Sequence, residues 1–144
     1  IGSDSQIGLD PREELRWLEY QARLGSGRRT VLGEGVRPDV AANLWLEASL
    51  GGAQACGASL GGLQPGADAD WLVLDDNDPA LAGCSTETVM GRWLFAPARH
   101  APIQVGVGGR VLAVQGRHSK RAEYAQAYRK AVIELGRSSV DGRT

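Results

Sequence analysis

Two apolar runs joined by a glycine pair constrain the fold of this chain more than any other feature of its sequence. In the stretch IQVGVGGRVLAVQGRH, residues 103–118, Gly108 and Gly109 separate the two runs. A Gly-Gly pair supplies the positive φ angles of the tight turns that join antiparallel strands. The apolar residues within 70–75 predict one further strand. Three strands make a thin sheet, which needs more strands or a covering layer to be stable.

The N-terminal part of the sequence predicts a well-bounded helix. It should begin at Pro11, with Asp10 as the N-cap and Glu13 completing a capping box, and end near Leu24 before a Gly-Ser-Gly turn. Its predicted apolar stripe consists of Leu15, Trp17, Leu18 and Ala22, and the charged residues predicted to lie largely outside it are Glu14, Arg16, Glu19 and Arg23.

Three more helical segments follow along the chain. Residues 39–56 predict a helix that Gly51 and Gly52 interrupt, so close packing or a bend is expected there. Residues 86–95 predict a short helix or an irregular segment that ends in RWLF. Residues 119–135 predict a last helix, before a tail that should fray. The predicted face of this last helix consists of Tyr124, Ala127, Tyr128, Ala131 and Leu135.

Composition and charge exclude several kinds of partner. Sixteen basic and 17 acidic residues give a net charge of -1, so the chain has no basic excess for binding nucleic acid. No run of about 18 apolar residues and no signal peptide is present, so no membrane partner is expected. Cys56 and Cys84 show neither metal-site spacing nor a disulfide framework, which fits reduced thiols in the cytoplasm.

Most residues that could carry chemistry have an ordinary structural interpretation. The adjacent Arg28 and Arg29 favour a solvated loop over an anion site. His100 and His118 form no His-x-His pair, and both are interpreted as surface histidines. From the residues alone, Asp4 is better interpreted as a turn cap than as a catalytic carboxylate. The tryptophans expected to pack in the core are Trp17, Trp45, Trp71 and Trp93.

Several stretches, taken together, resemble a known enzyme family. They are GSDSQ with EELRWLEYQARL behind it, GGAQACG, LQPGADADWLVLDDNDPALAG, RWLFA and VGVGGRVLAVQGRH. They cover nearly the whole chain in the right order, and the chain therefore resembles the formimidoylglutamate deiminases (N-formimino-L-glutamate iminohydrolases) of the amidohydrolase superfamily. The pattern LxPGxxADxLVLD is shared across the superfamily, whereas GSDSQ…EELRWLEY and RWLFA narrow the resemblance to the deiminases.

The resemblance implies an α/β fold that is the C-terminal part of a larger enzyme. Residues 1–57 would be the end of a metal-dependent (β/α)8 TIM barrel, with its last strand and helices. Residues 58–118 would supply strands of a small composite β-sandwich, and residues 119–144 a C-terminal helix and tail. A barrel needs about 250 residues, so an N-terminal barrel segment is expected before Ile1. The resemblance also implies a homodimer.

The resemblance implies that Asp4 is both a metal ligand and a catalytic residue. In that family the equivalent aspartate binds a single Zn²⁺ and takes a proton from the metal-bound water, whose pKa the zinc lowers toward 7. The hydroxide would attack the formimino carbon of N-formimino-L-glutamate and release ammonia, a step of histidine degradation. The other ligands, all histidines, are expected upstream of Ile1. Ser5 and Gln6 are candidates for contacting the small-molecule substrate, although a structural role is favoured for both.

Two other functions stay open at this point. Another deaminase or chlorohydrolase of the superfamily, such as a guanine deaminase-like enzyme, would share the same sandwich motifs. A self-standing, metal-free binding module would instead melt cooperatively when residues 1–144 are expressed alone.

Overall fold

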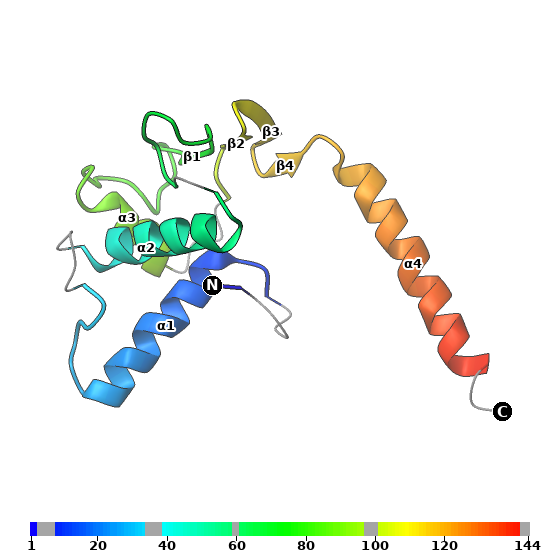
Figure 1. The fold of residues 1–144 in the computed structure, drawn as a ribbon, viewed down its shortest axis with the longest axis horizontal. Helices are drawn as coiled ribbons and strands as arrows, with labels where there is room; N and C mark the ends of the chain where they lie inside the picture. The colour runs from blue at the N-terminus through cyan, green and yellow to red at the C-terminus, as the bar shows by residue number, and fades with distance from the viewer. Residues whose placement is uncertain (3–7, 34–38, 59–60, 97–100, 142–144) are drawn as a thin grey trace.

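The computed structural model describes residues 1–2, 8–33, 39–58, 61–96 and 101–141. In chain order the elements are α1 (Pro11–Ser26), α2 (Val40–Ala55), β1 (Trp71–Val73), α3 (Val89–Phe95), β2 (Gln104–Val107), β3 (Arg110–Val114), β4 (Arg117–His118) and α4 (Arg121–Asp141). Helices α1, α2 and α3 gather on one side, the small sheet lies beside them, and α4 extends away from both (Figure 1). The fold is therefore a mixed α/β arrangement.

Helix α1 begins where the sequence predicts, but its cap differs in detail. The Asp10 carboxylate accepts a hydrogen bond from the backbone N–H of Arg12 at 2.9 Å, and Pro11 occupies the first helical position. The predicted capping box is wrong, because the N–H of Glu13 donates to the backbone carbonyl of Asp10 at 2.9 Å. Both carboxylate oxygens of Asp10 are instead engaged by the Arg12 guanidinium. The helix ends at Gly27, whose φ of 66° is left-handed.

The buried stripe of α1 is not the predicted one. Leu15 is buried as expected, but Trp17 and Leu18 are 50% and 48% exposed. Glu19, predicted to lie outside the stripe, is fully buried, and Arg12 is nearly so. Positions 12, 15 and 19 follow one another at spacings of three and four, so they share one helix face. That face packs toward α3. It is therefore buried, although the face beside it is more apolar.

Helix α2 runs through its glycine pair as one uninterrupted element. Asp39 caps its start by accepting a hydrogen bond from the N–H of Ala41 at 3.0 Å. The predicted close packing at Gly51 and Gly52 is wrong, since a Cβ at either position would meet no heavy atom within 4 Å beyond the helix's own backbone. Each glycine costs about 1 kcal/mol against alanine. The buried residues near the start of α2 therefore carry its packing.

The core of the helical part lies where α1, α2 and α3 meet. Its buried members are Leu15, Ala41, Leu44 and Leu94. The rings of Trp45 and Trp93 pack edge to face beside it, with centroids 4.8 Å apart. The prediction of a core role is confirmed for these two tryptophans and is wrong for Trp17.

The sheet is an antiparallel meander in the order β1-β2-β3-β4. The predicted hairpin is confirmed, with Gly108 and Gly109 at φ 56° and 76° between β2 and β3. The strand predicted over 70–75 is shorter, at Trp71–Val73. Strand β4 is an addition to the predicted three, because Gln115 and Gly116 also have positive φ and turn the chain back after β3. Glutamine rarely adopts this conformation, so the sequence gives little sign of the turn.

Two adjacent side chains at the start of β1 fasten this strand to the hairpin. The Trp71 indole covers Gly106, its partner across the strands, and donates from Nε1 to Oε1 of Gln104 at 3.1 Å. The Asp70 carboxylate accepts a hydrogen bond from the N–H of Gly108 at 2.7 Å and so caps the hairpin turn. The apolar ADWLVLD stretch is thereby tied to the VGVGG turn.

We expect Gly106→Ala to lower the free energy of unfolding of the intact protein by about 1–3 kcal/mol. A Cβ at Gly106 overlaps ring atoms of Trp71, so the indole must shift and its bond to Gln104 must weaken. Urea unfolding followed by tryptophan fluorescence measures the change. Gly51→Ala is the matched control, because its added Cβ meets open space. Equal losses of stability in the two variants would contradict the prediction.

Helix α4 extends further than predicted and packs differently. The segment 136–141, expected to fray, belongs to the helix, and residues 142–144 lie outside the described residues. The predicted packing face is exposed, with Tyr124 at 54% and both Tyr128 and Leu135 at 71%. Within the described residues, no helix is long and apolar enough to cross a membrane.

The chain exposes more surface than a compact protein of its mass. Its accessible surface is 10927 Å², whereas about 7,100 Å² is expected for a compact monomer of 15.3 kDa. Leu9, Leu24 and Leu63 are each more than three-quarters exposed. The internal packing of this chain alone therefore leaves a large apolar area in contact with solvent.

Candidate functional site

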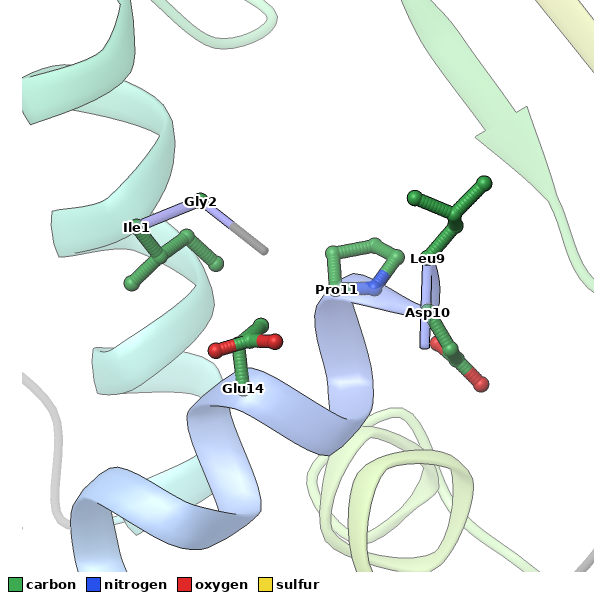
Figure 2. A pocket seen from close by; sticks show the side chains of 6 residues that line it. All are labelled: Ile1, Gly2, Leu9, Asp10, Pro11 and Glu14. Carbon is green, nitrogen blue, oxygen red and sulfur yellow. The ribbon is translucent and has the colours of Figure 1, made fainter. Parts of the chain in front are cut away.

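The predicted catalytic segment is bracketed by described residues that meet at the start of α1. Asp4, Ser5 and Gln6 lie outside the described residues. Ile1 and Gly2, which precede them, line a cavity of about 190 Å³ together with residues at the start of α1, which follow them. The cavity is lined by Ile1, Gly2, Leu9, Asp10, Pro11 and Glu14. Figure 2 shows the Glu14 carboxylate between Ile1 and Pro11.

A second, more open cavity of about 440 Å³ continues along the outer face of α1. Its lining adds Trp17, Leu18 and Gln21 to Ile1, Gly2 and Glu14. The half-exposed Trp17 and Leu18 thus belong to a groove rather than to the core. This surface combines the apolar side chains of Ile1, Trp17 and Leu18 with the polar side chains of Glu14 and Gln21.

The beginning of α1 is held in place by an ion pair. Nε of Arg12 lies 3.0 and 3.1 Å from the two carboxylate oxygens of Asp10, and Nη2 lies 2.7 Å from Oδ2. These hydrogen bonds from Arg12 lower the pKa of Asp10, although partial burial opposes the shift. The Arg12 guanidinium also lies over the Trp93 ring, 5.3 Å from its centroid. The cap of α1 is thereby joined to α3.

A buried carboxylate, which the sequence reasoning missed, organises the other end of α1. Oε1 of Glu19 accepts hydrogen bonds from Nε of Arg23 at 2.7 Å and from the N–H of Val31 at 3.2 Å. Oε2 accepts from the N–H of Leu32 at 2.9 Å, and the Asn43 amide donates to the Leu32 carbonyl at 3.0 Å. Burial raises the pKa of Glu19, but the hydrogen bonds from Arg23, Leu32 and Val31 outweigh it and leave the pKa lowered.

A sequence signal for this cluster exists, although it is weak. Glu19 and Arg23 stand four residues apart, the spacing of helical ion pairs. Such pairs are usually exposed, so the spacing alone does not reveal that Glu19 is buried. The cluster fastens the loop after α1 to α1 itself and to the start of α2.

The other residues considered as site candidates are two histidines, two adjacent arginines and two cysteines. His118 accepts a hydrogen bond at Nδ1 from the N–H of Lys120 at 3.1 Å and stacks on Tyr124 with a centroid distance of 5.5 Å. This partly buried position fits the ordinary role predicted for it, whereas His100 lies outside the described residues. Arg28 and Arg29 are exposed, as predicted, and Cys56 and Cys84 are free thiols.

The described residues do not by themselves fit a zinc centre. In the part of the chain that the structure describes, no group of three or more His, Cys, Asp or Glu side chains could hold a metal ion. A zinc site needs three or four ligands of these types. A contribution of this chain to such a site rests on Asp4.

Two of three comparisons with known proteins found a match. No family model matches the chain. A formimidoylglutamate deiminase of Pseudomonas aeruginosa is 42% identical over 135 residues, which are 94% of this chain and 30% of that protein. The crystal structure of an amidohydrolase from Brucella melitensis matches with a TM-score of 0.83 and 37% identity, over 94% of this chain and 29% of that one.

These matches confirm the resemblance inferred from the motifs. They also show how much of each matched protein the resemblance covers. The chain spans less than a third of the length of either protein that it matches. Over 94% of its own length, this chain is similar in sequence to a formimidoylglutamate deiminase and in fold to an amidohydrolase, and it corresponds to the C-terminal part of such an enzyme.

Proposed function

We propose that this chain is the C-terminal part of an enzyme that hydrolyses N-formimino-L-glutamate to N-formyl-L-glutamate and ammonia. The observation that carries the proposal is the 42% identity to a formimidoylglutamate deiminase over 94% of the chain. Residues 1–57 would close a (β/α)8 barrel, residues 58–118 would contribute to a β-sandwich, and residues 119–144 would form a C-terminal helix and tail. Helix α3, from the second segment, packs on α1 and α2 and would join the first two parts.

Asp4 is the residue of this chain that we assign to the reaction. Water adds to the formimino carbon, the bond from that carbon to the terminal nitrogen breaks, and ammonia leaves. The Asp4 carboxylate would accept a proton from the attacking water and return it to the departing nitrogen. Its place before α1 supports this role, because catalytic residues of barrel enzymes follow the carboxyl ends of strands. Ser5 and Gln6 are the neighbouring candidates for contacting substrate.

Zn²⁺ is the cofactor that we propose for the whole enzyme, with Asp4 as one ligand and histidines from other parts of the protein as the rest. When bound, zinc lowers the pKa of water toward 7. A homodimer and a cytoplasmic location complete the proposal. The dimer is supported by the resemblance, and the location by the two free thiols.

Ammonia release by the full-length polypeptide that contains this chain tests the proposal. N-formimino-L-glutamate is the substrate, guanine represents the ring substrates of related deaminases, and N-formyl-L-glutamate is the control. Zinc is quantified in the same sample. We expect release from N-formimino-L-glutamate alone, with about one zinc per chain. Turnover of guanine without turnover of N-formimino-L-glutamate would replace the proposed substrate with a ring.

The large exposed surface disfavours the rival interpretation as a self-standing binding module. A chain with 10927 Å² of accessible surface buries little apolar area for its mass. The free energy gained from that burial is therefore small compared with the conformational entropy lost on folding. The groove along α1, with Trp17 and Leu18 half-exposed, has the character of a surface that other protein covers.

A further inference from the structure

Helix α4 carries an apolar stripe that faces solvent along its length. Every residue from 121 to 137 is exposed, and α4 extends away from the other helices and from the sheet (Figure 1). The stack of His118 on Tyr124 joins the start of α4 to β4. The stripe consists of Tyr124, Tyr128, Ala131 and Leu135, which we call the α4 seam.

The spacing of the α4 seam is that of a helix that packs lengthwise on another helix. Its members follow one another at intervals of four, three and four residues, so each stands seven residues from another member. Two apolar positions repeated every seven residues form the narrow stripe by which helices pair. The opposite side of α4 is mainly polar, with Gln126 near its centre. The seam therefore points to a helix as its occupant.

The composition of the α4 seam favours contact with another protein molecule over burial inside one. Two of the three tyrosines of the chain lie in it. Tyrosine is enriched at interfaces between proteins, where its ring is buried and its hydroxyl group reaches water at the rim. Residues that are fully buried within one chain are more often purely apolar.

A second copy of α4 fits the seam when the two helices run antiparallel. In one register Tyr128 faces Ala131 of the second copy, so a large side chain meets a small one. In the same register Tyr124 faces Leu135 of the second copy. Large residues opposite small ones let two helices interdigitate, and a two-fold axis makes each of these contacts occur twice. None of the four members of the seam is charged, so the pairing opposes no like charges within it.

We propose that α4 binds the same helix of a second copy of the protein, in antiparallel orientation, through the α4 seam. The proposal gives a contact surface to the homodimer and rests on that part of the proposed function. It commits to the register in which Tyr128 and Ala131 face each other across the two-fold axis. Cover of the seam by another part of the same polypeptide is the competing outcome of the test.

Sedimentation velocity of the full-length protein over a range of concentrations measures the dissociation constant of the dimer. Tyr128→Glu places a charge at the centre of the seam. We expect it to raise the dissociation constant by at least about thirtyfold, as loss of a central interface residue does. Gln126→Glu adds the same charge on the opposite side of α4 and is the matched control. Its dissociation constant should equal that of wild type.

An exchange of side-chain size tests the register itself. Tyr128→Ala leaves a gap opposite Ala131, and Ala131→Tyr sets two tyrosines against each other. We expect each change alone to raise the dissociation constant by about tenfold or more. The double variant again has one large and one small residue in the layer, with their positions exchanged. Its dissociation constant should return to within about fivefold of the wild-type value, because the two changes compensate each other.

The proposal is overturned by a wild-type protein that stays monomeric at every concentration, or by a dimer that Tyr128→Glu leaves as tight as before. It is also overturned by a double variant that dimerises no better than the single variants. If Tyr128→Glu fails to fold, the size exchange decides, and failure of those variants to fold would show that the same polypeptide covers the seam. Dimerisation is measured without substrate, so a dimer that releases no ammonia refutes the proposed hydrolysis alone.

Discussion

Asp4→Asn in the full-length protein is expected to lower kcat for ammonia release from N-formimino-L-glutamate by about 10³-fold, within the 10²- to 10⁴-fold range of general acid–base catalysis. Asparagine has nearly the shape of aspartate, but its amide cannot accept the proton of the attacking water or return one to the leaving nitrogen. The fold should be unaffected, because the helix that follows is capped by Asp10 and not by Asp4. Stopped-time ammonia assays over a range of substrate concentrations separate kcat from KM.

The matched control for this variant is Asp68→Asn, at an exposed position in the turn before β1. It removes the same charge from the same chain without touching the start of α1. We expect its kcat to equal that of wild type. If Asp4→Asn retains kcat within a few-fold of wild type, Asp4 is not the proton acceptor, and the turn-cap interpretation of this residue stands.

Local signals explain which parts of the fold could be predicted from the sequence. The start of α1 is encoded by Asp10 and Pro11, and the β2–β3 turn by Gly108 and Gly109, each within a few residues of the feature that it determines. Caps and tight turns depend on backbone geometry at one position, so a single sequence suffices to locate them. The end of α1 at Gly27 has the same local origin.

What the sequence did not show depends on contacts between distant segments. The burial of Glu19 requires the loop at Val31 and Leu32 to fold back over α1, and no residue near Glu19 encodes that return. Trp17 and Leu18 carry a core-like pattern, yet α3 packs against the neighbouring face of α1. The role assigned to Asp4 is likewise not encoded by its neighbours in the sequence. It rests on the resemblance and on metal ligands expected from other parts of the enzyme.

Glu19→Gln is expected to lower the free energy of unfolding by about 2–3 kcal/mol. The carboxylate is fully buried and accepts three hydrogen bonds, two of them from backbone N–H groups. Glutamine fits the space, but its amide nitrogen would face a donor, so one N–H loses its partner. The Arg23 side chain is 33% exposed and can turn toward water, which keeps the loss below that of a fully buried pair. Denaturant unfolding of the intact protein measures it, with the exposed Glu123→Gln as the control.

The difference in unfolding free energy between wild type and Glu19→Gln should depend on pH, and the pKa of Glu19 fixes the direction of that dependence. The pKa of Glu19 in the folded protein is lowered from its ordinary value of 4.5. The unfolded chain therefore takes up the proton first as the pH falls, and the stabilisation by Glu19 is fully present above about pH 4.5 and lost as the pH falls through the lowered folded pKa. Asp10 titrates in the same acidic range, but it is present in both proteins and cancels in their difference. The gap in stability between wild type and Glu19→Gln should thus be constant at neutral pH and narrow below pH 4.5. A gap that stays constant into the acid range would mean that Glu19 is not held as a carboxylate by Arg23 and the two backbone donors.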